Sequence, residues 1–158
     1  MTRIDVATAR RLAPRSAGAV TRGRLTDEER RWRAMSEDDL QTAITDLAVV
    51  FGWHWLHVGK LRTKYGWRTP TRGTLAAWPD LTLVRERDRR LIFAELKREL
   101  EPVKPEQEAV LDVLGALQWS GAPLVGGAGW SPSIEVAVWR PSDLADPIET
   151  SRIYEALR

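Results

Sequence analysis

Apolar residues recur at helical spacing over residues 37–51 and predict the first long helix of the chain. Ser36 is a favourable N-cap before this segment, and Gly52 is a residue type that commonly ends a helix. The same reasoning predicts shorter helices over residues 26–34, 105–119 and 151–157. The apolar stripe of the first long helix consists of Leu40, Ala43, Ile44, Leu47, Ala48 and Phe51.

Short apolar or alternating runs predict four strands, over residues 53–58, 80–85, 90–97 and 134–139. The charged residues 86–89 fit a turn that joins the second and third strands into a hairpin. The order helix, three strands, helix, strand, helix predicts an α/β fold with a mixed central sheet flanked by helices.

The other segments have no clear period. Residues 1–25 mix Ala, Arg, Gly, Thr and Pro and are expected to be disordered. Residues 59–78 form a long connection, which in compact domains is usually functional or disordered. We therefore expect a basic arm over residues 1–33 and one folded domain over residues 34–158.

Charge is distributed unevenly along the chain, although its net value is only +2. Residues 1–33 carry nine arginines and four acids, a net charge of +5, which leaves −3 for the remainder. Arginine forks match phosphate geometry, so such an arm can hold a polyanion. A solvated, disordered tail explains the same composition equally well.

Composition excludes several classes of site. The chain has no cysteine, which removes disulfides, thiolate zinc sites and cysteine nucleophiles, and it fits a reducing cytosol. No apolar run approaches the roughly 18 residues needed to cross a bilayer. We therefore expect a cytoplasmic protein without a membrane partner.

Three residues carry the predicted chemistry. Asp80 begins one strand of the hairpin, and Glu95 and Lys97 lie near the end of the other. Strand side chains alternate, so Glu95 and Lys97 share a face, and the antiparallel hairpin brings Asp80 beside them. Carboxylates can hold Mg²⁺ with positions left for substrate and water, and a neighbouring lysine can orient that water during phosphodiester hydrolysis.

An ordinary surface hairpin with a Glu–Lys pair is the alternative interpretation of these three residues. The apolar run Leu91–Ala94 leads directly into Glu95, and Leu81 and Leu83 follow Asp80. Charged residues at the ends of buried strands usually have a function, which favours the metal site.

The chain resembles the PD-(D/E)xK nuclease superfamily and, within it, the VRR-NUC family in its small stand-alone form common in phages and prophages. The resemblance covers about residues 36–144 and rests on residues whose order and spacing both fit. These are Ser36, Glu37 and Gln41, Gly52 and Trp53, His57, Trp78–Leu81, Phe93–Lys97, Pro105–Gln107 and Val138–Asp143.

The resemblance implies a restriction-endonuclease-like αβββαβ core and a nuclease that uses Mg²⁺, with Mn²⁺ as a substitute. It implies that Asp80 and Glu95 are metal ligands and that Lys97 is the catalytic lysine. Glu37 matches an acid that completes the metal shell, although a negative charge at that place also suits a helix N-terminus. Gln107 matches a catalytic-site glutamine of the second core helix, although a helix-surface role is the alternative.

Further candidates concern nucleic acid. Trp67 and Trp130 can stack on unpaired bases or cover the core, whereas Trp53, Trp55, Trp119 and Trp139 are expected in the core. His57 can touch a phosphate or be structural, and Arg140 can contact phosphate or pair with Asp143. The expected nucleic-acid-binding residues are Lys60, Arg62, Lys64, Arg68, Arg72 and Arg140.

The sequence thus predicts a metal-dependent DNA endonuclease, with branched DNA such as Holliday junctions or flaps as an expected substrate. Junction cleavage needs two symmetric sites and therefore a homodimer. The alternatives are a non-catalytic DNA-binding module with the same fold, and a nuclease that acts on RNA or on DNA ends.

Overall fold

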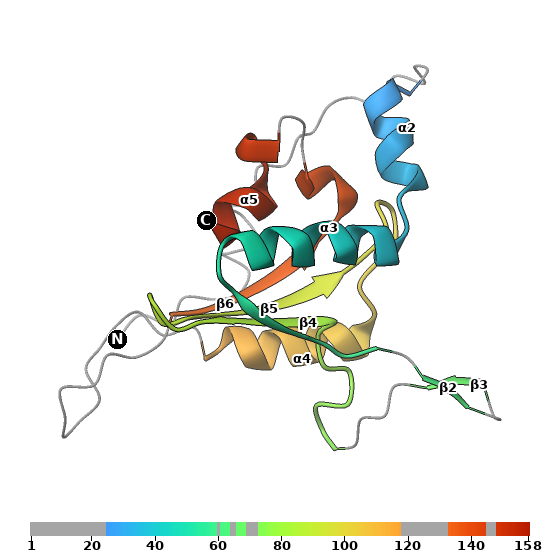
Figure 1. The fold of residues 1–158 in the computed structure, drawn as a ribbon. Coiled ribbons are helices and arrows are strands. Elements are labelled where there is room, and N and C mark those ends of the chain that lie inside the picture. Colours follow the sequence, from blue (N-terminus) through green and yellow to red (C-terminus); the bar gives the residue numbers. More distant parts are fainter. Residues whose placement is uncertain (1–24, 60, 64–65, 69–72, 118–132, 145–147) are drawn as a thin grey trace, which may run out of the picture.

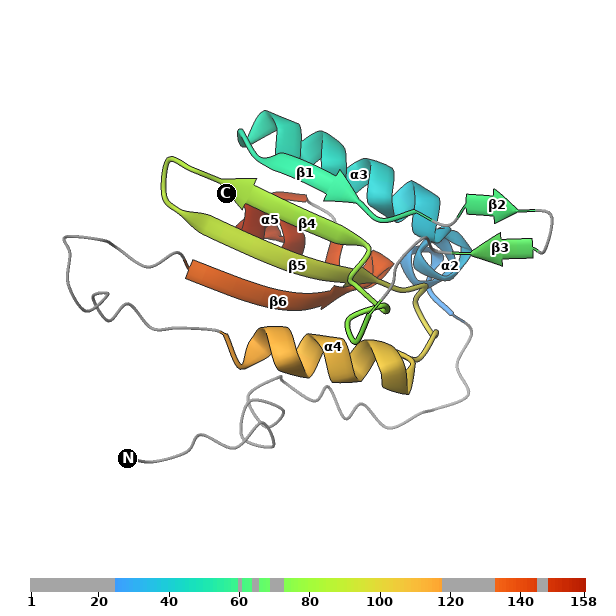
Figure 2. The ribbon, with the colours of Figure 1, turned by 90° about the horizontal axis from the view of Figure 1, so that it is seen from below.

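A four-stranded mixed sheet forms the centre of the computed structural model, which describes residues 25–59, 61–63, 66–68, 73–117, 133–144 and 148–158. The strand order is β1-β4-β5-β6, with antiparallel pairing of β1 with β4 and of β4 with β5, and parallel pairing of β5 with β6 (Figure 2). The predicted mixed sheet is confirmed. The strands are β1 (His54–His57), β4 (Leu81–Arg85), β5 (Arg90–Leu96) and β6 (Ser133–Trp139).

Helices cover both faces of this sheet (Figure 1). Helices α3 (Glu37–Val50) and α5 (Arg152–Leu157) lie on one face, and α4 (Pro105–Gly115) lies on the other. The first face holds the larger core, in which Leu40 and Ile44 of α3 pack with Leu81 and Leu83 of β4. On the second face, Phe93 packs with Val110 and Leu114 of α4. The structure is therefore an α/β fold in which the sheet separates two apolar layers.

Local sequence explains where α3 begins and which side it buries. The Ser36 hydroxyl accepts a hydrogen bond from the Asp39 backbone N–H at 3.1 Å, and the Asp39 carboxylate accepts one from the Ser36 backbone N–H at 3.3 Å. Leu40, Ile44 and Ala48 are fully buried, as the helical spacing predicts. The chain then turns at Gly52, whose φ of +74° favours a residue without Cβ.

The short helix α2 (Asp27–Ala34) confirms the helix predicted over residues 26–34. Thr26 and Glu29 form the capping box that the sequence indicates. The last part of the expected arm is therefore helical, whereas residues 1–24 lie outside the described residues.

The connection over residues 59–78 contains a small hairpin that the sequence did not predict. It consists of β2 (Leu61–Thr63) and β3 (Gly66–Arg68), of which only the backbone is described, and it extends beyond the sheet (Figure 1). Each strand has three residues, so the apolar alternation that identifies a strand has no room to appear.

Two other predictions were wrong in detail. Helix α4 ends at Gly115 rather than at residue 119, and Leu117, within the predicted helix, is 55% exposed. Glycine has low helix propensity, which accounts for the earlier end. Trp55, expected in the core, is 44% exposed because β1 is the edge strand of the sheet. Trp53 and Trp139 are buried as expected, and Trp119 and Trp130 lie outside the described residues.

Two arginines and a tryptophan hold the C-terminal helix on the sheet. The Arg85 guanidinium is 2% exposed and donates to the backbone oxygens of Leu157, at 2.7 Å, and Arg158, at 2.9 Å. Arg85 also forms an ion pair with Asp88 at 2.6 Å and lies 4.4 Å from the Trp53 ring. Arg90 donates to Ala156, and the Trp53 indole donates to Leu157. The carbonyls that end α5 thus find partners on the sheet.

Among the described residues, no helix combines the length and apolar character needed to span a membrane.

We predict that Arg85→Met destabilises the fold by roughly 3 kcal/mol, because it removes the buried guanidinium donors from the carbonyls at the end of α5 and leaves Leu157 with the Trp53 indole as its side-chain donor. Urea unfolding followed by circular dichroism measures this change. Arg87→Ala is the matched control: Arg87 is exposed and contacts Arg158 only at 3.3 Å, so we expect a change below about 0.5 kcal/mol. Equal effects of the two substitutions would contradict the proposed role of Arg85.

Candidate active site

Asp80, Glu95 and Lys97 converge at one end of the sheet, as the hairpin predicts. Leu81 pairs with Ala94 across β4 and β5, so Asp80 lies just before β4 and beside the end of β5. One carboxylate oxygen of Asp80 accepts the Leu96 backbone N–H at 2.8 Å. This bond holds Asp80 beside the segment that carries Glu95 and Lys97.

The Glu95 carboxylate is fully buried, and its two oxygens have different surroundings. Oε1 accepts hydrogen bonds from the Lys97 ammonium, at 2.5 Å, and from the Gln107 amide. Oε2 has no hydrogen-bond partner. Among the described residues, it is the one buried side-chain oxygen or nitrogen without a partner. Native structures rarely leave a buried carboxylate oxygen unpartnered, so this atom indicates a ligand site.

Burial raises the pKa of the Glu95 carboxyl from its ordinary value of 4.5 to about 7, and the nearby Asp80 carboxylate also raises it, although Lys97 acts in the opposite direction. A buried carboxyl whose charge a neighbouring carboxylate disfavours is an arrangement that a cation would relieve.

Lys97 and Gln107 hold Glu95 from two different elements. The Lys97 ammonium is 5% exposed and also donates to the Leu96 carbonyl at 2.9 Å. Gln107, in the first turn of α4, donates to Glu95 while its oxygen accepts the Lys104 backbone N–H at 3.1 Å. The sequence prediction that Gln107 lies at the site is therefore confirmed in its position; its catalytic role stays a prediction.

A cavity of about 350 Å³ opens beside Asp80, Lys97 and Gln107, between the start of β4 and the first turn of α4. A second cavity of about 290 Å³ lies on the other side of Asp80 and includes Gln41 and His57. Asp80 and Glu37 line both. The first cavity is lined by Glu37, Val58, Ala76, Ala77, Trp78, Asp80, Lys97, Glu101, Lys104, Glu106 and Gln107.

The residues present fit a divalent cation held by two carboxylates. Mg²⁺ is commonly bound by one or two carboxylates and completed by water and phosphate oxygens, and the free Oε2 of Glu95 beside Asp80 supplies such a pair. Within the described residues no group of three or more His, Asp or Glu side chains is close enough to hold a metal. Glu37 thus lines the cavity without completing a three-acid group, and its role as a ligand stays a prediction.

The side chains of most predicted nucleic-acid-binding residues are not described by the structure. Lys60, Lys64 and Arg72 lie outside the described residues, and Arg62 and Arg68 lie in β2 and β3, described by backbone alone. The Arg140 guanidinium donates to the carbonyls of Arg98 and Glu101, both at 2.7 Å. Its backbone N–H, rather than its guanidinium, donates to Asp143 at 2.9 Å. Of the two alternatives for Arg140, pairing with Asp143 is thus present through the backbone, and phosphate contact stays a prediction.

The sequence interpretation missed Glu101 and Lys104, which line the first cavity. Both precede the predicted helix at residue 105 and lie in the segment that leads from Lys97 to Gln107. Lys97 and Gln107, at the two ends of that segment, were both predicted at the site, and this was the signal from which its middle could have been placed nearby.

Comparisons of the chain with protein-family models, with curated proteins and with solved structures gave no match. The function therefore has to be argued from the site itself.

We predict that the metal-free protein loses stability as the pH rises from about 4.5 to 7. The folded state binds the Glu95 proton more tightly than the unfolded chain, so this contribution is complete below pH 4.5 and disappears as the pH passes 7. The loss is on the order of 3 kcal/mol at most. Unfolding in EDTA at several pH values, for the natural protein and for Glu95→Gln, measures it.

Glu95→Gln should show a flatter profile over this window, since the amide does not titrate. Glu86→Gln, at the exposed turn between β4 and β5, serves as a control that should keep the natural profile. Parallel profiles for the natural protein and Glu95→Gln would show that Glu95 is not buried in this way.

Proposed function

We propose that the protein is a metal-dependent DNA nuclease that hydrolyses phosphodiester bonds at the cavity beside Asp80, Glu95 and Lys97. One observation carries the proposal: the fully buried Glu95 carboxylate has one oxygen held by Lys97 and Gln107 and the other free, next to a second carboxylate. A carboxylate with only a structural role would be expected to have both oxygens satisfied.

In this proposal each residue of the site has its own role. Asp80 and the free oxygen of Glu95 would hold Mg²⁺ or Mn²⁺, which when bound stabilises negative charge on the phosphate and lowers the pKa of a water molecule. Lys97, as the ammonium bound to Glu95, can orient the attacking water and stabilise charge on a phosphate oxygen. Gln107 keeps the Glu95 carboxylate turned so that its second oxygen stays free.

The arrangement of elements supports the restriction-endonuclease-like core and the VRR-NUC resemblance. Without the small β2–β3 hairpin, the order from α3 to β6 is helix, three strands, helix and strand. Asp80, Glu95 and Lys97 lie at the place where that resemblance expects the active site. Branched DNA as the substrate, and the homodimer that junction cleavage needs, belong to the same proposal.

We predict that Mg²⁺ and Mn²⁺ bind the natural protein in the absence of DNA and raise its melting temperature at pH 8, because a ligand that binds only the folded state stabilises it. Asp80→Asn should lose most of this increase, since one of the two carboxylates is gone. Calorimetric titration with Mn²⁺ gives the affinity directly. A metal-induced increase that is equal in Asp80→Asn would place the cation elsewhere.

We predict Mg²⁺-dependent cleavage by the natural protein, and a loss of about 10²-fold or more in Asp80→Asn and in Lys97→Met. The assay uses linear duplex, single-stranded, flapped and four-way DNA, with Mg²⁺, Mn²⁺ or EDTA, and RNA of the same sequence. Arg87→Ala, at the far end of the sheet, should cleave like the natural protein.

The outcomes separate the alternatives. DNA binding without metal-dependent cleavage would favour the non-catalytic binding module, and cleavage of RNA or of DNA ends alone would change the substrate class. Full activity of a correctly folded Asp80→Asn would remove Asp80 from the proposed mechanism.

A further inference from the structure

Among the side chains that the structure describes, most cations around the site are engaged, but three are not. Lys97 is bound to Glu95, and Arg140 is bound to backbone carbonyls. In contrast, the exposed side chains of Arg33, Arg98 and Lys104 form no hydrogen bond or ion pair with any described residue. Hydrogen bonds to Thr26 are the main cause of the lowered pKa of the Glu29 carboxyl. The charge of the nearby Arg33 adds to this lowering.

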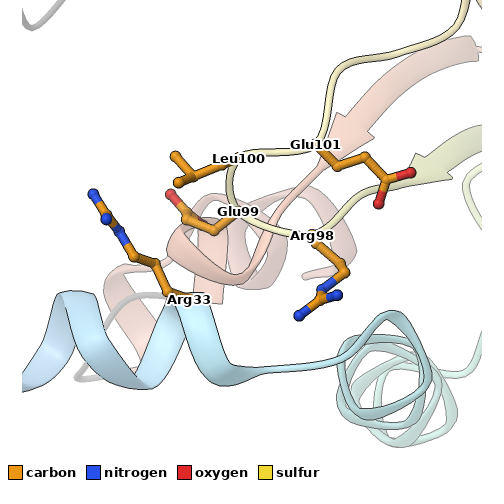
Figure 3. A pocket seen from close by; sticks show the side chains of 5 residues that line it. All are labelled: Arg33, Arg98, Glu99, Leu100 and Glu101. Carbon is orange, nitrogen blue, oxygen red and sulfur yellow. The ribbon is translucent and has the colours of Figure 1, made fainter.

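These three cations lie along two adjoining cavities. Lys104 lines the cavity of the proposed active site, and Arg33 and Arg98 line a neighbouring cavity of about 290 Å³. Glu101 lines both cavities and so joins them. Figure 3 shows Arg33 extending from α2 and Arg98 from the loop after β5, with the Glu101 side chain directed away from Arg33.

The loop that carries Arg98 is held in place. The Arg140 guanidinium donates to the carbonyls of Arg98 and Glu101, at the two ends of this loop. The Ser142 backbone N–H donates to the Glu99 carboxylate at 3.0 Å. The Glu99 carboxylate, which also lines the neighbouring cavity, is held by this hydrogen bond to Ser142. A fixed loop presents Arg98 and Lys104 at set positions on either side of Glu101, which lowers the entropy lost when a charged strand binds.

We infer that Arg33, Arg98 and Lys104 form a phosphate-binding track, along which the backbone of the DNA strand passes from the proposed active site across the loop 98–101 toward α2. Unpaired arginine and lysine side chains next to a phosphodiester site are suited to neutralise the phosphates that flank the reacting one. The track rests on the proposed function for its substrate class, and it assigns a binding role to residues that the sequence interpretation did not select.

Binding in EDTA tests the track without any dependence on cleavage. Fluorescence anisotropy with a labelled 20-nucleotide single strand and the matching duplex gives Kd over a range of salt concentrations for the full chain. The slope of log Kd against log salt should fall by roughly 0.7 for the single strand and 0.9 for the duplex for each phosphate contact removed. The variants are Arg33→Ala, Arg98→Ala, Lys104→Ala and the triple variant.

Charge-conserving variants are the matched controls. Arg33→Lys, Arg98→Lys and Lys104→Arg should keep the natural slope, as should Arg87→Ala, which alters a distant cation. Natural slopes in the correctly folded triple variant, or no DNA binding by the natural protein, would overturn the track.

Cleavage in Mg²⁺ then separates the two proposals. With both correct, the triple variant has a raised KM and a nearly natural kcat, whereas Asp80→Asn loses kcat and still binds. Changed salt slopes in a protein that never cleaves would refute the nuclease and support the track. Cleavage with unchanged slopes would support the nuclease and refute the track.

Discussion

The buried carboxylate of Glu95 is the constraint on which the site depends. A charged group with no solvent exposure is costly unless each of its oxygens is satisfied, and here Lys97 and Gln107 satisfy only one of them. The Asp80 carboxylate beside it adds to the cost. A fold can keep such a group because the hydrophobic layers on both faces of the sheet stabilise the whole domain. The strain is local, and a bound cation is the simplest means of relieving it.

The topology of the sheet explains why four side chains from three segments reach this one point. Antiparallel pairing places the start of β4 beside the end of β5, and with them Asp80 beside Glu95. Parallel pairing of β5 with β6 requires the chain to return across the sheet, and α4 makes that crossing. Its first turn therefore starts near the end of β5, where Gln107 meets Glu95. At the opposite end of β4, Arg85 holds α5 and leaves the site end open.

Sequence reasoning predicted the parts that depend on period and pairing. The stripe of α3, the hairpin of β4 and β5, and the convergence of Asp80 with Glu95 all follow from local patterns and proved correct. It failed where the outcome depends on long-range neighbours: the exposure of Trp55 reflects the edge position of β1, and the guanidinium of Arg140 binds a loop 39 and 42 residues away. The free oxygen of Glu95 also could not be predicted, because it depends on which donors the end of β5 and the distant helix α4 bring to the carboxylate.

The most direct test of this account is an anomalous diffraction map from a crystal of the natural protein soaked in Mn²⁺. The account predicts one strong peak in the cavity, at about 2.1 Å from the Oε2 atom of Glu95 and from an Asp80 oxygen, with Lys97 still bound to the other Glu95 oxygen. The same soak of Asp80→Asn should weaken or abolish that peak. A map without a peak at Glu95 in the natural protein, or with its strongest peak on other residues, would contradict the claim that this buried carboxylate is a metal ligand.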